Sequence, residues 1–520
     1  MLRAAAVAAS VIAVFLGVMY LRFHGDTIPA STPTPLTTPN RVSISEFCKT
    51  YPRVPKPPQC GPVNGLFLRP TVPPTPASSA PTPEVREQLT ILRAGRNIGR
   101  DAELGRIAFV RGDDIWVKEL AGGEERRLTD DQRNTAPHWS ADGRWIAFQK
   151  RPADPSIGYG SSEWWVMTAD GQSTAKVADE AFSLSWSSVN SVLAYTGGGF
   201  INTLNPETGE RRALVRAGDF AWAPDGLNIA FDWSEDAGGD GSMCAGGFRI
   251  YGTVCQVRQG LSVVNAEGSG ARRDIYQVTH QSSAGPIPVL HGWSRDGRYL
   301  SFWQESIDSS SISADGAPLF VIPVDGGEPR ELGRTLLDQE GIMSWAPNGS
   351  QIAFVDGGGR DIWVRKHLVI SDLTGAGTAF RNDDGTAELN PAWSPQGDVI
   401  AFSRGEGRAP EDTNRDPEPA ATRRIWLGDS AGRAQQLTSD PTYSDNWPTW
   451  SSDGSHILFV RVMAGDFQGY GIRSGANVEL WLMNADGSDQ RKVADVGAST
   501  AEGYYGLIHW DQLFDWYRAQ

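Results

Sequence analysis

A short unit centred on one tryptophan recurs seven times after residue 100, and this repeat limits the folds that the chain can adopt. Typical copies read HWSADGRWIAF at residues 138–148, AWAPDGLNIAF at 221–231 and TWSSDGSHILF at 449–459. Successive tryptophans stand 36 to 71 residues apart, with spacings centred near 50. That period is typical of a blade of about four strands and not of helical repeats. The repeat tryptophans are Trp139, Trp186, Trp222, Trp293, Trp345, Trp393 and Trp450.

Each part of the unit has a mechanical role. The apolar triplet, such as Ile146-Ala147-Phe148, predicts a short buried strand. A tryptophan buried between stacked sheets removes roughly 200 Å² from water, or about 5 kcal/mol gross, and so holds neighbouring sheets together. A Gly-containing pair before the triplet predicts a two-residue hairpin turn in which both residues take positive φ. These pairs are Asp142-Gly143, Asp225-Gly226, Asp296-Gly297, Asn348-Gly349 and Asp453-Gly454.

A third strand is predicted after most units by segments such as DIWVKELAGG, RIWLGDSAG and ELWLMNADG. The segments ERRLTDD and AQQLTSD mark a fourth strand. Four strands in each repeat are typical of a propeller blade, so we expect an all-β protein built as a β-propeller. The third strands are expected to begin near Asp114, Glu163, Gly260, Pro318, Arg424 and Glu479.

The two ends of the repeat region complement each other. The segment from Gly105 has the second and third strands but no opening tryptophan strand, and the C-terminal segment YYGLIHWDQLFDWY has an isolated opening strand. We expect Trp510 to close the ring beside Ile107–Phe109, which would give eight four-stranded blades and leave no free edge. Seven blades remain the alternative, with the weak Trp186 unit as an insertion.

The repeat resembles that of the TolB-type β-propeller family, which is WD-like and also occurs in the non-catalytic domains of prolyl oligopeptidases. The series W-S-P-D-G, I-A-F, D-I-W-V and N-A-D-G carries the resemblance over roughly residues 105–511. The resemblance implies the propeller fold. The chain departs from TolB itself because it shows no α/β domain before residue 100 and more blades than the six of TolB.

The N-terminal region divides into an apolar segment and a linker. Residues 4–21 contain no charge and are long enough to cross a hydrocarbon core, so residues 1–24 predict an uncleaved signal anchor. Between residues 29 and 83 lie 15 of the 33 prolines, mixed with Thr and Ser. Residues 25–100 therefore predict an extended linker, and residues 101–520 the propeller.

The four cysteines form two near pairs. Cys48 and Cys60 lie within the linker, and Cys244 and Cys255 lie in the long interval after Trp222. Neither spacing matches a metal clip, so we expect two local disulfides, with free thiols as the alternative. Together with the anchor, they predict a single-pass membrane protein whose propeller lies on the extracytoplasmic side, in the periplasm or at the cell surface.

A search for catalytic chemistry finds no strong site. There is no G-x-S-x-G motif and no hydrolase domain after the repeats. His138, His291 and His509 lie near blade tryptophans and could face a central channel. We interpret them as polar residues that line the channel, with a metal site as the alternative. Asp412, Asn414 and Asp416 begin like a calcium loop, yet Pro417 occupies the place of the turn glycine. We therefore assign no catalytic, cofactor or metal residues.

Charge and fold together favour a binding function. The formal net charge of −15 argues against nucleic acid and against an anionic membrane surface as partners, and the membrane is expected to contact only the N-terminal helix. We expect a monomeric scaffold that binds a protein, a peptide or a cell-envelope glycan on one face. The alternatives are a lyase or hydrolase that cleaves polysaccharide or peptide at the channel, and a purely structural surface protein.

Overall fold

The computed structural model describes residues 104–518 apart from residues 154–161, 180, 238–255, 282–284, 307–315, 336–340, 358–360, 376, 380–384, 409–418, 470, 498–502 and 505. The predicted anchor and linker, the four cysteines and the Asp412–Asp416 segment lie outside the described residues. Within the described part of the chain, no helix is both long and apolar enough to cross a membrane. The expected anchor, disulfides and localisation therefore stay predictions.

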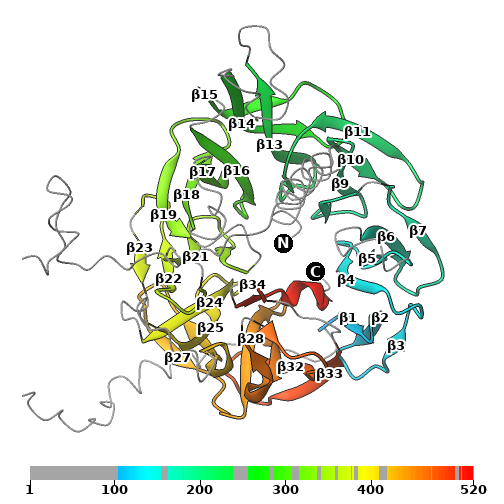
Figure 1. Cartoon of the computed structure of the whole chain (residues 1–520), viewed down its shortest axis with the longest axis vertical. Coiled ribbons are helices and arrows are strands. Elements are labelled where there is room, and N and C mark those ends of the chain that lie inside the picture. The colour runs from blue at the N-terminus through cyan, green and yellow to red at the C-terminus, as the bar shows by residue number, and fades with distance from the viewer. Residues whose placement is uncertain are drawn as a thin grey trace, which may run out of the picture. The chain divides into compact units, whose positions relative to one another are not determined.

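The described residues confirm an all-β chain of antiparallel sheets, which follow one another around a ring (Figure 1). The first three four-stranded sheets are β36 (Phe514–Tyr517), β1 (Arg106–Arg111), β2 (Asp114–Glu119) and β3 (Arg126–Arg127); β4 (Asn134–Trp139), β5 (Trp145–Lys150), β6 (Glu163–Thr168) and β7 (Thr174–Lys176); and β8 (Leu184–Trp186), β9 (Leu193–Gly197), β10 (Phe200–Leu204) and β11 (Arg211–Arg216). The Trp186 unit thus forms a sheet of its own and is not an insertion.

Three further four-stranded sheets and one larger sheet complete the ring. The four-stranded sheets are β12 (Phe220–Trp222), β13 (Asn228–Asp236), β14 (Gln256–Asn265) and β15 (Arg273–Gln281); β24 (Thr386–Trp393), β25 (Ile400–Glu406), β26 (Arg424–Gly428) and β27 (Ala434–Gln436); and β28 (Tyr443–Trp450), β29 (His456–Met463), β32 (Val478–Asn484) and β33 (Arg491–Val496). The larger sheet has eight strands: β16 (Pro286–Trp293), β17 (Tyr299–Ser306), β18 (Ala317–Pro323), β19 (Arg330–Thr335), β21 (Ile352–Asp356), β22 (His367–Ser371) and β23 (Gly377–Ala379), with β20 (Met343–Trp345) on β21. Its two halves join through the single pair Thr335 and Asp356.

Short elements fill the connections between these sheets. They are the 3-10 helices η5 (Pro419–Thr422), η6 (Ala464–Asp466) and η7 (Trp510–Gln512), and the hairpins β30 (Phe467–Gln468) with β31 (Gly471–Ile472) and β34 (Gly503–Tyr504) with β35 (Leu507–Ile508).

The hairpin turn of the repeat differs from the expected two-residue form. Gly143 has a φ of 67°, but Asp142 is not in the positive-φ region. The Gly143 N–H donates to the Ser140 carbonyl at 2.9 Å, and the Ser140 hydroxyl donates to Asp142 at 2.7 Å. The loop is therefore a longer turn in which glycine alone takes the left-handed conformation. The carboxylate instead accepts hydrogen bonds, as Asx residues do in turns.

The repeat tryptophans join consecutive sheets by a hydrogen bond as well as by burial. The Trp186 indole N–H donates to the His138 carbonyl at 2.9 Å, and the Trp450 indole donates to the Ala392 carbonyl at 2.9 Å. In each case the acceptor is the residue just before the tryptophan of the preceding sheet. Trp222 and Trp293 make the same contact with Ser185 and Ala221. Each bond fixes the position of one sheet against the next.

The ring closes through the C-terminus, but the closing strand is not the one expected. β36 pairs with β1, so that Trp516 lies opposite Ile107. The same register joins Trp450 to Ile457 and Trp393 to Ile400. Trp516 is therefore the eighth repeat tryptophan. The prediction that residues 507–511 pair with residues 106–110 is wrong, because Leu507–Ile508 pairs with Gly503–Tyr504 instead.

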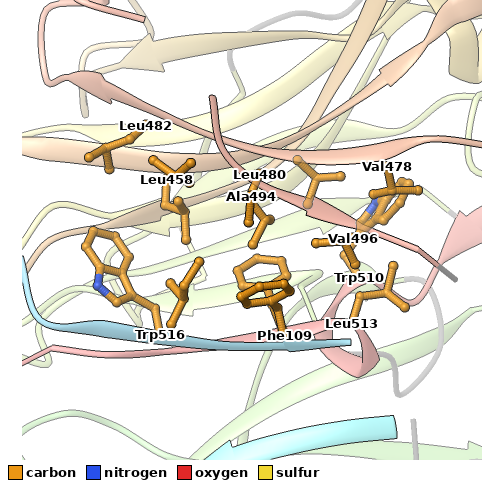
Figure 2. Close-up of a cluster of buried hydrophobic side chains, with 14 of the residues drawn as sticks. Phe109, Leu458, Val478, Leu480, Leu482, Ala494, Val496, Trp510, Leu513 and Trp516 are labelled. Atoms are coloured by element: carbon orange, nitrogen blue, oxygen red, sulfur yellow. The ribbon is translucent and has the colours of Figure 1, made fainter. Parts of the chain in front are cut away.

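Trp510 lies in η7, within the largest core cluster of the described residues. Figure 2 shows it between the last complete sheet and the closing one, beside Val478, Val496 and Leu513. The Arg111 Nε of β1 donates across the same seam to the Asp495 carbonyl at 2.8 Å. The seam thus combines a continuous apolar core with polar contacts at its edge.

The segment that leads to β36 crosses the inside of the ring. Gly506 lies so close to Trp363 and Ile362, on the β21–β22 connection, that a Cβ there would collide with both. Six residues later, the Gln512 carbonyl accepts a hydrogen bond at 3.1 Å from the Thr135 hydroxyl of β4. We call residues 506–512 the C-terminal strap. In Figure 1, β34 and the red C-terminal helix lie within the ring near its centre.

Replacing Trp450 by Phe tests the indole hydrogen bond between sheets. Trp450→Phe removes the donor to Ala392, and we expect it to lower the free energy of unfolding by about 1–2 kcal/mol more than a control without this bond. Trp393→Phe is the matched control, because the Trp393 indole nitrogen is buried and makes no hydrogen bond within the described residues. Urea denaturation followed by circular dichroism measures both. Equal losses would show that the bond contributes nothing beyond packing.

Candidate functional site

The two ends of the sheets differ in the connections that they carry. At one end, short turns follow the repeat tryptophans; we call it the turn end. At the other, which we call the loop end, the second strand joins the third and each sheet joins the next. There β25 runs to β26 over residues 407–423, and β29 to β32 over residues 464–477. Long connections on a rigid scaffold are the usual place for binding residues.

An open groove lies at the loop end of the β24–β27 sheet, beside the connection that leads to β28 and beside η6 and β30. Its volume is about 850 Å³, within the range of roughly 300–1,000 Å³ common for ligand sites. We call it the loop-end groove. The side chains that define its chemistry are Arg404, Glu406, Arg424, Trp426, Gln436 and Phe467.

A buried ion pair forms the base of this groove. Glu388 of β24 and Arg404 of β25 are direct cross-strand partners. Arg404 donates to one Glu388 oxygen from Nε at 2.8 Å and from Nη2 at 2.5 Å, and the other oxygen accepts the Leu368 N–H at 2.7 Å. The Glu388 side chain is 0% exposed and the Arg404 side chain 6% exposed, so each buried charge depends on the other to compensate for its loss of water.

Trp426 stands over this ion pair on the third strand. The Arg404 guanidinium lies 4.5 Å from the centre of the Trp426 ring and 5.1 Å from that of Phe402. Phe402 and Trp426 are opposite each other in the β25–β26 pair. The stacking combines a cation–π contact with a fixed guanidinium, and it holds the half-buried indole in one orientation.

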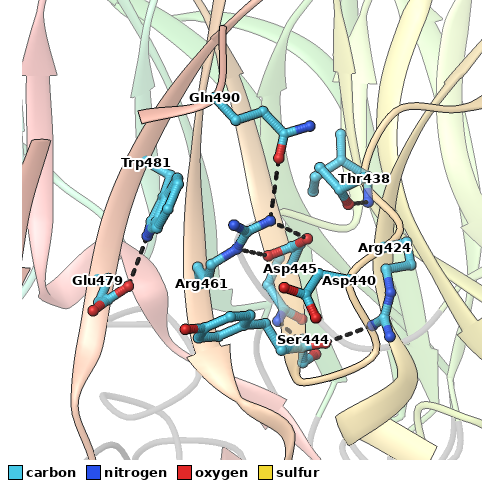
Figure 3. Close-up of polar contacts among 12 residues, drawn as sticks. Arg424, Thr438, Asp440, Ser444, Asp445, Arg461, Glu479, Trp481 and Gln490 are labelled. Atoms are coloured by element: carbon cyan, nitrogen blue, oxygen red, sulfur yellow. Dashed lines mark hydrogen bonds and ion pairs between the residues drawn. The ribbon is translucent and has the colours of Figure 1, made fainter. Parts of the chain in front are cut away.

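The neighbouring sheet repeats the arrangement (Figure 3). Arg461 of β29 donates to both oxygens of Asp445 at 2.7 Å and 3.0 Å, and it lies 4.3 Å from the Trp481 ring centre. Gln490 contacts the same guanidinium at 3.4 Å. The Trp481 indole N–H donates to Glu479 at 2.7 Å, so this tryptophan is satisfied within its own strand.

The sequence contains a signal for this arrangement of cation and tryptophan that the tryptophan repeat alone does not reveal. A cation stands two residues after the phenylalanine of the apolar triplet, and a tryptophan stands in the third strand. Because alternate residues of a strand share a face, these side chains meet. The same contact joins Lys150 to Trp165 at 5.0 Å and Arg111 to Trp116 at 5.1 Å. The acidic partner of the groove, Glu388, stands five residues before Trp393, as Asp445 does before Trp450.

Arg424 differs from the other groove cation because backbone carbonyls hold it. Its Nη1 donates to the Arg423 and Tyr443 carbonyls, each at 2.6 Å. Burial lowers the pKa of Arg424, while the charges of Asp445 and Asp440 oppose that effect. The two carbonyls hold the guanidinium in a fixed position, and Arg424 lines the groove; Figure 3 shows its side chain beside Asp440.

A buried lysine lies next to the groove base. Lys366 is 0% exposed; its Nζ donates to the Val364 carbonyl at 2.8 Å, and its own carbonyl accepts the Glu388 N–H at 2.9 Å. Burial lowers the pKa of Lys366 to about 8, against the opposing charges of Asp361 and Asp356. The charged form of this side chain thus destabilises the fold.

The histidines considered from the sequence do not converge. His291 contacts the Ser301 hydroxyl at 3.0 Å, His138 packs against Trp164, and His509 lies in the C-terminal strap. Among the described residues, no group of three His, Cys, Asp or Glu side chains could hold a metal ion. None of the eight tryptophans named from the repeat, Trp510 included, lines the loop-end groove.

One serine and histidine pair has a catalytic-like contact with the wrong geometry. The Ser455 hydroxyl lies 2.7 Å from His456 Nδ1 and contacts Asp453 at 2.7 and 2.8 Å. In a catalytic triad the histidine stands between serine and carboxylate, whereas here serine stands between the other two. All three lie in a turn at the turn end, and Ser455 and His456 are buried. The hydrogen bonds of Ser455 therefore stabilise this turn.

A second cavity of about 660 Å³ lies at the turn end, between the β12–β15 sheet and β16–β19. Its exposed polar residues include Ser269 and Arg295. Among the described residues that line it, no buried ion pair and no tryptophan stacked on a cation is found. We use it below as a comparison site.

Comparison with known proteins gives no family assignment. No family model matches the sequence, and no curated protein matches it. Among solved structures, dipeptidyl peptidase 4 of Porphyromonas gingivalis aligns with 79% of this chain and 61% of its own, at 11% identity and a TM-score of 0.49. This chain thus covers about three fifths of the peptidase's length.

Two further solved structures are similar at lower scores. A TolB protein of Agrobacterium tumefaciens aligns with 75% of this chain and 88% of its own, at 14% identity and a TM-score of 0.30. An oligogalacturonate lyase of Vibrio parahaemolyticus aligns with 68% and 94%, at 14% identity and a TM-score of 0.38. Similarity at this level carries no conclusion about activity, substrate or partner.

Breaking the buried pair at the groove base should be costly, and removing both of its members less so. Glu388→Gln leaves Arg404 buried without a countercharge, and we expect a loss of about 3–5 kcal/mol in the free energy of unfolding. The double variant Glu388→Leu/Arg404→Met should lose less than Glu388→Gln alone. A double-mutant cycle with the single variants Glu388→Leu and Arg404→Met, followed by urea denaturation, measures the coupling. A double variant as unstable as the sum of both single ones would contradict the ion pair.

Lys366 should make the protein more stable as the pH rises above neutrality. Its pKa is about 8 in the fold against 10.5 for the ordinary side chain, so between these values the unfolded chain binds more protons than the folded one. The free energy of unfolding should therefore increase from about pH 8 to pH 10.5, by up to about 3 kcal/mol. Lys366→Met should remove this increase. The difference between the pH profiles of the two proteins isolates the lysine; parallel profiles would contradict its burial in the charged state.

Proposed function

We propose that the chain is an eight-bladed β-propeller that acts as a ligand-binding scaffold at the cell envelope. Six four-stranded sheets and the two halves of the eight-stranded sheet supply eight sets of four strands. The apolar residues 4–21 would hold the protein in the membrane as a single span, with the propeller on the extracytoplasmic side. We further propose that it works as a monomer and binds no nucleic acid.

The loop-end groove supports a binding function. Its cation–π stack and its ion pair are fixed in the fold, so that a ligand need not order them. Such preorganisation reduces the cost of binding. Glu388 and Arg404 at the groove base are held in an ion pair with each other. A general acid or base, by contrast, must exchange protons with a substrate. The arrangement therefore suits recognition.

The enzyme alternative places cleavage of polysaccharide or peptide at the centre of the ring. There the C-terminal strap contacts the β21–β22 connection at Gly506 and β4 at Gln512. A substrate entering from the side of the strap would have to displace it. This geometry favours the groove over the ring centre as the ligand site.

Capture of envelope material by variants of the full chain tests this function. Immobilised protein is exposed to a detergent extract of cell envelopes, and the retained material is quantified. We expect Glu406→Ala/Gln436→Ala, which alters two exposed groove side chains, to retain at least about fivefold less than the native chain.

The control alters the cavity at the other end of the sheets. Ser269→Ala/Arg295→Ala changes two exposed residues there and should retain as much material as the native chain. Equal retention by all three proteins would exclude the groove as the binding site. Release of new sugar reducing ends or peptide amines from the extract would establish the enzyme alternative instead.

A further inference from the structure

We propose that the loop-end groove binds a neutral oligosaccharide, with one sugar ring against Trp426 and its hydroxyls on the surrounding polar side chains. This inference rests on the proposed binding function and names the class of ligand. Three features of the groove carry it: the unpaired indole donor of Trp426, the absence of an open strand edge at the positions described below, and the balance of charge.

The indole N–H of Trp426 differs from those of the equivalent tryptophans. Trp165 donates to Glu163 at 3.1 Å and Trp481 to Glu479 at 2.7 Å, in both cases to the residue two positions earlier. At the corresponding position before Trp426 stands Arg424, which can only donate. The Trp426 indole therefore has no acceptor among the described residues, and a hydroxyl oxygen of a ligand would supply one.

Three backbone N–H groups at the groove are already paired, which leaves fewer of them for a peptide. Strand addition by a peptide needs an open sheet edge. The Ile425 N–H donates to the Thr438 hydroxyl at 3.0 Å, and the Glu406 N–H to the Thr422 hydroxyl at 2.8 Å. At the neighbouring strand, the Asp445 N–H donates to the Arg423 carbonyl at 2.9 Å. At these positions, side chains are the groups left for recognition.

The side chains offer both donors and acceptors with little excess charge. Glu388 neutralises Arg404, which leaves Arg424 as a donor and the exposed Glu406 as an acceptor. Gln436 can both donate and accept. Sugar hydroxyls also do both. A polyanion would find one partly engaged guanidinium beside a carboxylate, on a chain whose net charge is −15.

The indole supplies the apolar contact. The face of a sugar ring that carries C–H groups is apolar and flat, and it fits an aromatic side chain that is held rigidly. Trp426 is half-buried in the groove wall, with Phe402 and Gln436 opposite it on the neighbouring strands. An aromatic body with a polar tip is suited to a ligand that presents both kinds of surface.

Isothermal titration of the full chain with neutral hexaoses tests the inference. The probes are maltohexaose, cellohexaose, mannohexaose and N-acetylchitohexaose, each to about 10 mM. We expect at least one to bind once per chain, and Trp426→Ala to weaken that binding by at least about tenfold. Trp481→Ala is the matched control: it removes the same cation–π stack from the next sheet, outside the groove, and should leave the affinity unchanged.

Arg424→Gln tests the two donors of the groove together, the Arg424 guanidinium and the Trp426 indole N–H, without removing the ring. The introduced carboxamide oxygen can accept the Trp426 N–H, as Glu163 and Glu479 do for their tryptophans. We expect this variant to stay folded and to lose at least about fivefold in affinity for the same hexaose.

The outcomes separate this inference from the broader function. Failure of every hexaose to bind, or binding that Trp426→Ala leaves unchanged, would overturn the glycan assignment. Suppose that, in addition, hexaproline bound in the groove, or that Glu406→Ala/Gln436→Ala no longer captured a protein that the native chain captures from the envelope extract. The scaffold function would then stand, with a peptide or protein as the ligand. If groove and control variants captured equally and no hexaose bound, both proposals would fall.

Discussion

Each sheet of this ring depends on its neighbours, because both of its faces carry apolar side chains that only the adjacent sheets cover. The repeat tryptophan meets this need in two ways. It buries a large ring between two sheets, and in four sheets its indole N–H reaches the backbone carbonyl just before the preceding tryptophan. A carbonyl at that place exists whatever the side chain, so the contact can recur while the surrounding residues vary.

A chain of such contacts needs closure, since an open series would leave one apolar face exposed at each end. The complementary ends of the sequence predicted that the first and last strands share one sheet. The structure contains this sheet, in which β36 pairs with β1. The tryptophan that marks it was misidentified, because Trp510 and Trp516 stand six residues apart and each stands two residues after an apolar residue. Within a hairpin, turn length would have set the register; here the partners are about 400 residues apart, and only the equivalence of Ile107 with Ile457 and Ile400 identifies Trp516.

The candidate site was predictable in its parts but not as a groove. The spacing of Phe402, Arg404 and Trp426 follows the two-residue period of strands, so their contact could have been expected from the repeat. Glu388 stands at the same distance before its tryptophan as Asp445 does, which would have supplied the countercharge. The groove itself depends on η6 and on the connections around Thr422 and Pro441, which belong to no repeat and whose geometry is set by tertiary contacts.

A repeat fold makes departures from its pattern informative. Where a residue serves the fold, more than one sheet can keep it, as Glu163 and Glu479 show beside their indoles; the Trp116 indole donates to the Arg111 carbonyl instead. Arg424 occupies that place in one sheet, and it leaves a partly buried donor without an internal acceptor. An unmet donor lowers stability unless water or a ligand satisfies it. The Trp426 indole nitrogen is not among the buried polar atoms without a partner, so water can satisfy it in the free protein, and a ligand hydroxyl at the wall of the loop-end groove would replace that water.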